Sequence, residues 1–76
     1  MSGLNNLKPN RVIRAFERDG WKIERRTGSH IILSKRGKPG IISIPVHKGK
    51  PIKQGLLRKQ IEIAGMSIED FLNFYR

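Results

Sequence analysis

The sequence predicts an α+β fold in which helices pack on one face of an antiparallel three-stranded sheet. Apolar residues recur at helical spacing towards both ends of the chain, whereas the middle holds three short strand-like segments. The connections between these segments are short, which favours an antiparallel meander because parallel strands need long crossovers. The predicted order is therefore α-β-β-β-α with a short C-terminal helix, and residues 1–76 are expected to form a single domain.

The first predicted element is a helix over residues 9–19. Pro9 suits the first helical position, where its missing N–H removes no hydrogen bond, and Gly20 is a natural left-handed stop. Apolar residues repeat at helical spacing between them: Val12, Ile13 and Phe16. The charged residues on the other side are Arg11, Arg14, Glu17 and Arg18. The arginines among them form either a solvated face or a surface for nucleic acid, and residues 1–6 are expected to be frayed.

Two strands joined by a tight turn are predicted next. Residues 21–26 alternate, with Trp21 and Ile23 on one face, and residues 27–28 form the turn. Trp21 could stack on a base, but its place directly after a helix stop favours the core. The second strand covers residues 30–35. Alternation divides this strand into two faces: Ile31 and Leu33 on one, and His30, Ile32 and Ser34 on the other.

A third strand and a second helix follow. The strand is predicted over residues 41–46, where Pro45 indicates a sheet edge or the end of the strand. A basic loop over residues 47–51 leads into a helix over residues 53–64. The apolar positions of this helix form one stripe: Leu56, Leu57, Ile61, Ile63 and Ala64.

The short last helix is predicted from a capping motif. Gly65 closes the preceding helix, and Ser67 is followed three residues later by Asp70, which resembles a capping box. Apolar residues then recur at helical spacing: Ile68, Phe71, Leu72 and Phe74.

Charge is the strongest feature of the composition. The chain carries 16 lysines and arginines against 6 acidic residues, which gives a net charge of +10. All of these basic residues except Arg76 lie in residues 1–60, whereas half of the acidic residues lie in residues 61–76. Such an imbalance predicts a polyanionic partner, and nucleic acid is favoured over a membrane.

The sequence also indicates the cellular compartment. No apolar run approaches the ~20 residues that cross a bilayer, and the chain does not start with a signal-peptide core. There is no cysteine, which excludes disulfides and thiolate metal sites and is compatible with a reducing cytosol. We therefore expect a cytoplasmic protein without a membrane partner.

One stretch of sequence brings together groups that can attract a phosphate and move a proton. His30 stands at the start of a predicted strand, behind a Gly–Ser turn and two arginines. An imidazole with a reference pKa of about 6.5 suits the removal of a proton from the 2′-hydroxyl of RNA, and cationic side chains stabilise charge on phosphoryl oxygens. The alternative is that His30 only hydrogen-bonds the turn backbone. The residues expected to bind RNA are Lys22, Arg25, Arg26, Ser29, His47 and Lys48.

Two other mechanisms fit the residues less well. Two-metal nucleases need clustered carboxylates, but the strand region offers only Glu24, which is expected to share its face with Lys22 and Arg26. Two histidines without further ligands make a poor zinc site, so no metal or other cofactor is expected. Ser29 lacks the Asp-oriented histidine of a triad and is expected to bond a phosphate oxygen or the turn backbone. For His47, RNA contact, proton donation and loop anchoring all stay open.

Three motifs and the helix that follows them resemble the HicA toxins of bacterial and archaeal toxin–antitoxin pairs. The motifs are Gly20-Trp21, Gly28-Ser29-His30 and Pro45-Val46-His47, and the resemblance extends over about residues 7–72. It implies a fold like a double-stranded-RNA-binding domain and a type II toxin that cleaves messenger RNA without the ribosome. His30 matches the catalytic histidine of that family. The resemblance also implies a HicB antitoxin, and we expect an acidic partner that covers the turn around Gly28 to His30.

The favoured hypothesis is therefore a metal-independent endoribonuclease that cleaves messenger RNA with His30 as general base. The alternative is a non-catalytic double-stranded-RNA-binding module that uses the same basic face for shape recognition. A third hypothesis is a small basic protein associated with the ribosome or DNA. His30 discriminates between them, because a protein that only binds has no need of an imidazole at the start of the strand.

Overall fold

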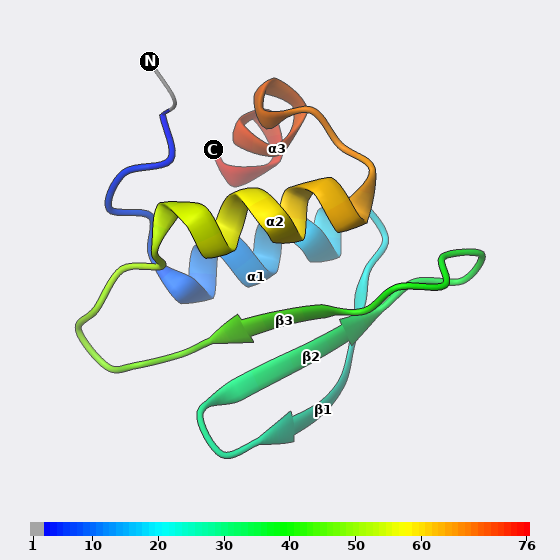
Figure 1. The fold of residues 1–76 in the computed structure, drawn as a ribbon, viewed down its shortest axis with the longest axis horizontal. Helices are drawn as coiled ribbons and strands as arrows, with labels where there is room; N and C mark the ends of the chain where they lie inside the picture. The colour runs from blue at the N-terminus through cyan, green and yellow to red at the C-terminus, as the bar shows by residue number, and fades with distance from the viewer. Residues whose placement is uncertain (1–2) are drawn as a thin grey trace.

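The computed structural model describes residues 3–76 and confirms the predicted α+β architecture. Its elements are α1 (Pro9–Arg18), β1 (Lys22–Thr27), β2 (His30–Ser34), β3 (Ile42–Pro45), α2 (Gln54–Ala64) and α3 (Ile68–Tyr75). The strands form one antiparallel sheet in the order β1-β2-β3. Helices α1 and α2 cover one face of the sheet, and α3 lies beyond them, on the side away from the strands (Figure 1). This is the layout of a double-stranded-RNA-binding domain with an added C-terminal helix.

Local signals in the sequence set the helix boundaries. Pro9 begins α1 after an extended Lys8, and each boundary predicted from the sequence lies within one residue of the observed one. Gly65 ends α2 in a left-handed conformation, with a φ of 77°. The hydroxyl of Ser67 accepts a hydrogen bond from the Asp70 amide at 3.0 Å, which confirms the predicted N-cap of α3.

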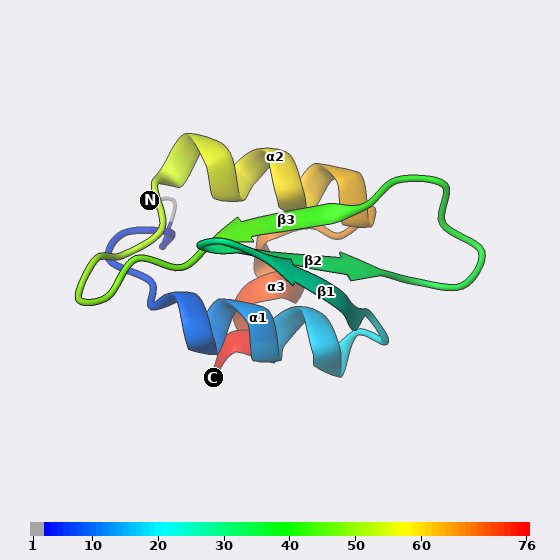
Figure 2. The same cartoon turned by 90° about the horizontal axis from the view of Figure 1, so that it is seen from below.

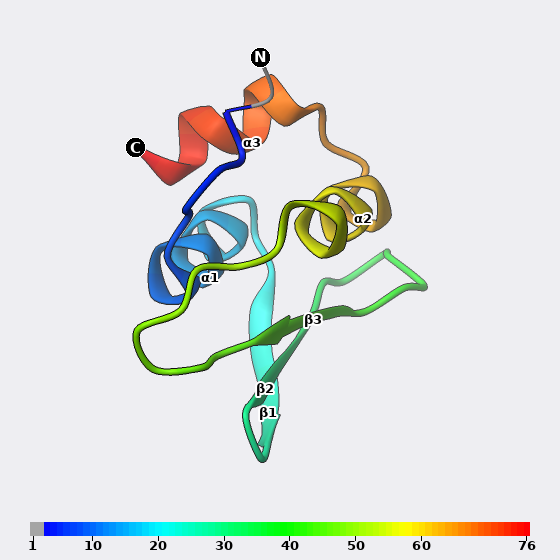
Figure 3. The same cartoon turned by 60° about the vertical axis from the view of Figure 1, so that its left-hand side comes forward.

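The core lies between the helices and one face of the sheet. Trp21, directly before β1, is 1% exposed, which confirms its predicted place in the core. Ile23 is 37% exposed because β1 is an edge strand that runs away from the helices (Figure 3). The strand residues that join the core are Ile31, Leu33, Ile42 and Ile44. They define the helix-facing side of the sheet, and Figure 2 shows the strands from the other side, here called the helix-free face.

Strands β1 and β2 form a hairpin that projects from the helical layer (Figure 3). Thr27 pairs with His30 across a turn made by Gly28 and Ser29, one residue later than predicted. Gly28 has a φ of 56°, a left-handed conformation that glycine adopts without a Cβ clash. Every residue of β1 is exposed, so the hairpin is open to a large partner.

A β-bulge in β1 changes which of its side chains share a face. The pairing with β2 shifts between Ile23 and Arg25, so Glu24 is the extra residue. The observed pairs are Lys22 with Ser34, Ile23 with Leu33, Arg25 with Ile32, and Arg26 with Ile31. Residues opposite each other point to the same side of a sheet. The prediction that Lys22, Glu24 and Arg26 share a face is therefore wrong, because the extra residue places Lys22 and Arg26 on opposite faces.

The segment before α1 is packed rather than frayed. Leu4 is fully buried and Leu7 is 8% exposed, and both belong to the core. The Leu7 carbonyl accepts a hydrogen bond from the Ile52 amide at 3.0 Å, which ties the segment to the loop before α2. The prediction of a frayed start is thus wrong for residues 3–6, while residues 1–2 lie outside the described part of the chain. Burial of Leu4 is the physical reason.

Helix α3 is held against α1 by apolar and polar contacts. The ring centroids of Phe16 and Phe71 lie 5.1 Å apart. Arg11 donates to the Tyr75 carbonyl at 3.2 Å, and Arg18 donates to the carbonyls of Phe74 and Arg76. The last carbonyls of a helix have no intrahelical hydrogen-bond donor. Two arginines of the exposed α1 face supply donors to such carbonyls at the C-terminal end of α3.

Candidate nucleic-acid site

His30 lies at one end of the helix-free face. It is the first residue of β2, its side chain is exposed, and it pairs with Thr27 on one side and Pro45 on the other. Since Ile31 and Leu33 enter the core, alternation places His30 on the opposite side of the sheet, as predicted. The imidazole is therefore open to a substrate that lies across this face.

The strand register selects which predicted cations accompany His30. Arg25 pairs with Ile32, so it lies on the helix-free face two positions along β2 from His30. Lys22 shares that face but pairs with Ser34, about 13 Å from His30 along the strand. Arg26 lies on the other face of the sheet. Of the two arginines in β1, Arg25 is therefore the one that lies on the same face of the sheet as the His30 imidazole.

The β1–β2 turn and the loop after β3 meet at the same end of the sheet (Figures 1 and 2). The Val46 amide donates a hydrogen bond to the Ser29 carbonyl at 2.6 Å, which extends the contact between the two segments beyond the end of β3. His47 and Lys48 follow directly and are exposed. The fold therefore brings Ser29, His47 and Lys48 to the end of the sheet that carries His30.

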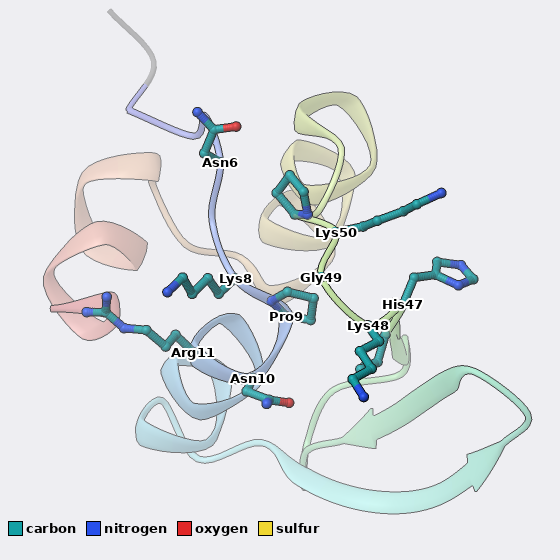
Figure 4. A pocket seen from close by; sticks show the side chains of 11 residues that line it. Asn6, Lys8, Pro9, Asn10, Arg11, His47, Lys48, Gly49 and Lys50 are labelled. Atoms are coloured by element: carbon teal, nitrogen blue, oxygen red, sulfur yellow. The ribbon is translucent and has the colours of Figure 1, made fainter.

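A groove opens beside this loop, between residues 6–11 and residues 46–51 (Figure 4). Its volume is about 840 Å³, and its walls carry no carboxylate. Its basic side chains are Lys8, Arg11, Lys48 and Lys50, with His47 at one edge. In Figure 4 the side chains of His47, Lys48 and Lys50 extend from the loop, while those of Lys8 and Arg11 extend from the other wall in the direction away from the loop. We call this feature the basic groove.

Comparison with known protein families fits this arrangement. The model of the HicA toxins of bacterial toxin–antitoxin systems matches residues 9–66. The chain belongs to the HicA toxin family. Membership implies that this HicA-family protein has an antitoxin partner. No curated protein sequence matches the chain.

The family match covers the elements that carry the site but not the whole HicA-family chain. It begins with α1, includes the sheet and α2, and ends just after Gly65. The buried Leu4 and Leu7 and the whole of α3 lie outside it. Helix α3 packs against α1, and Leu4 and Leu7 join the same core, so both flanking segments stabilise the common part of the fold.

Few of the cations are neutralised within the HicA-family protein. Across residues 3–76 the only ion pair joins Lys35 to Asp19, at 3.4 Å. The cations around His30 and the basic groove therefore face solvent without a carboxylate within ion-pair distance. Among the same residues, no three side chains of His, Cys, Asp or Glu lie together as a metal-binding group. None of their helices has the length and apolar character that would take it across a membrane.

Sequence reasoning missed part of the basic groove. The basic loop over residues 47–51 was evident, but Lys8 and Arg11 join it only because the Leu7–Ile52 hydrogen bond draws the two segments together. Both segments lack acidic residues, but so do all of residues 1–16 and 25–61, so no signal in the sequence singles out this pair of segments.

Proposed function

We propose that this HicA-family toxin is a metal-independent endoribonuclease that cleaves messenger RNA, with His30 as the general base. The observation that carries the proposal is an exposed histidine at the start of β2, on the same face of the sheet as Arg25 and beside the Ser29 turn. An imidazole that only braced the turn would need no cationic face around it. Family membership as a toxin and the net charge of +10 support the same conclusion.

The proposed reaction uses the nucleophile that RNA itself provides. His30 takes the proton of a 2′-hydroxyl, whose oxygen forms a bond to the adjacent phosphorus as the bond from phosphorus to the 5′-oxygen breaks. The leaving 5′-oxygen receives a proton, and the products are a 2′,3′-cyclic phosphate and a 5′-hydroxyl. His47 is the only other imidazole of the chain and is the candidate proton donor.

The cations stabilise the charge that develops on the phosphoryl oxygens. Arg25 is the first candidate because of its face and its distance along β2, and the exposed Ser29 and Lys48 lie at the same end of the sheet. Lys22 is placed to hold a phosphate farther along the strand. Arg26 lies on the opposite face, so we assign it the smallest part in binding the reacting phosphate.

The fold also supports a second candidate function. Its double-stranded-RNA-binding layout and unneutralised cations suit a module that binds RNA by shape without cutting it. In either case we propose a cytoplasmic protein controlled by a HicB-like antitoxin that covers the turn from Gly28 to His30. An acidic surface on that antitoxin would match the basic residues around the turn.

The test uses purified protein, an RNA substrate and EDTA. The proposal predicts cleavage in the presence of the chelator, products with 2′,3′-cyclic phosphate ends, and no cleavage where the 2′-hydroxyl at the cleaved position is replaced by hydrogen. Binding without cleavage would favour the non-catalytic module. Cleavage that needed added Mg²⁺, or that proceeded on the 2′-deoxy substrate, would contradict the proposed chemistry.

A further inference from the structure

The basic groove contains more positive charge than the proposed reaction requires. His47 and Lys48 were predicted to contact RNA, but Lys8 and Lys50 also line the groove and have no part in that reaction. Among the described residues, no hydrogen bond or ion pair engages the ammonium group of Lys8, Lys48 or Lys50. Arg11, in contrast, bonds the Tyr75 carbonyl and stacks over the Tyr75 ring at 4.4 Å. Three lysines of the groove are therefore available to an external anion.

The two walls of the groove are fixed before any ligand arrives. The Leu7 carbonyl accepts from the Ile52 amide at 3.0 Å, which joins the segment before α1 to the loop before α2. The Tyr75 hydroxyl accepts from the Lys8 amide at 3.0 Å, so α3 supports one wall from behind. A preformed groove loses little conformational freedom when it binds, which favours affinity.

The groove is also continuous with the catalytic end of the sheet. His47 lines it, and the preceding residue, Val46, is hydrogen-bonded to Ser29 in the turn beside His30. A strand of RNA whose cleaved bond lies at His30 can therefore continue past His47 into the groove. This continuity favours one occupant of the groove, a polyanion that is already bound at the turn.

We propose that the basic groove is a second phosphate-binding subsite, which holds the RNA chain on one side of the cleaved bond through Lys8, Lys48 and Lys50. Pro9 and Pro51 add apolar surface against which a ribose or base can pack. The inference rests on the proposed ribonuclease function and extends it. The enzyme should prefer substrates long enough to reach from His30 into the groove, because only these gain the additional phosphate contacts.

The test compares RNA substrates of increasing length. The variant is the double substitution K8Q/K50Q, which removes two charges at exposed positions without touching His30 or the β1–β2 turn. The matched control is R36Q/K38Q, which removes the same charge from the exposed loop between β2 and β3, at the opposite end of the sheet. The kcat and KM of each protein are measured with a dinucleoside monophosphate and with longer oligoribonucleotides.

The proposal predicts a defect that depends on length. With long RNA, K8Q/K50Q should raise KM about tenfold relative to R36Q/K38Q while kcat changes little. With the dinucleoside monophosphate, the two variants and the wild type should have the same kcat/KM. Equal KM values for the two variants on long RNA would overturn the subsite, as would an equal defect at every length. Absence of cleavage by the wild type at any length would instead refute the proposed ribonuclease function.

Discussion

Arg25 and Arg26 are neighbours in the chain, but the bulge at Glu24 separates them onto opposite faces of the sheet. No local pattern reveals this, because β1 has no apolar residue after Ile23 that would require one register over another. Alternation counted from Trp21 places Arg25 on the helix-facing side. The observed pairing with Ile32 places it on the helix-free side with His30.

The bulge leads to a prediction about two otherwise equivalent arginines. Arg25→Glu should weaken RNA binding by about tenfold or more, because it removes a charged contact on the face of His30 and adds a repulsion. Arg26→Glu makes the same change of charge on the other face and should weaken binding clearly less. Fluorescence anisotropy with labelled RNA at one fixed salt concentration measures both. Equal losses of affinity would show that the register does not select the binding residues.

At the scale of elements, α3 and the segment before α1 close the side of the molecule away from the sheet. Phe71 is fully buried and contacts Phe16, and Tyr75 accepts a hydrogen bond from the Lys8 amide. Both flanking segments lie outside the family match, yet both contribute to the core. We infer that α3 stabilises the fold and, through Tyr75, the wall of the basic groove.

Two substitutions in α3 test how much this helix contributes to the stability of the fold. Phe71→Ala should lower the free energy of unfolding by about 3–5 kcal/mol, since it leaves a cavity against Phe16. That is a large part of the roughly 4–11 kcal/mol expected for a chain of this length. Asn73→Ala, at an exposed position of the same helix, should change it by about 0.5 kcal/mol or less. Urea denaturation measures both, and similar effects from the two substitutions would show that α3 is not part of the cooperative fold.

The elements were predictable where their signals are local, and less so where packing decides. Gly65 and Ser67 mark helix ends through their own conformation and hydrogen bonding, and both behave as predicted. Leu4 looked like part of a frayed end, because nothing nearby in sequence shows that α3 returns to meet this side of the molecule. The basic groove escaped prediction because it depends on contacts between segments distant in the chain, whereas the bulge escaped because β1 has no apolar residue after Ile23 to mark its register. His30 was placed correctly because the apolar run after it fixes the register of β2.

At the scale of the whole molecule, few internal ion pairs offset the net charge of +10, and basic side chains surround the proposed site. The only ion pair within residues 3–76 lies at Asp19 and Lys35, and residues 61–76 carry half of the acidic residues. Near His30 and in the basic groove, Arg25, Lys8, Lys48 and Lys50 carry positive charge that no carboxylate of the described residues neutralises. This asymmetry attracts RNA, and it also suits an acidic inhibitor that competes for the same end.

This view of inhibition predicts a specific pattern of protection. In a complex with the antitoxin, amide hydrogen exchange should slow in the turn from Gly28 to His30 and in the loop from His47 to Lys50. Added salt should reduce the association rate more than it raises the dissociation rate, because complementary charges act mainly on encounter. Protection confined to residues 62–74, with the turn still exchanging freely, would mean that the antitoxin grips the less basic end and leaves the site open.

The most direct measurement of the central claim is the single-turnover cleavage rate of His30→Ala on RNA in EDTA. His30 is exposed and lies outside the core, so the variant should keep its unfolding transition and most of its RNA affinity. Loss of the general base should slow cleavage by roughly 10²–10⁴-fold. A folded, RNA-binding His30→Ala protein that cleaves at the wild-type rate would falsify the assignment of His30 as the catalytic base.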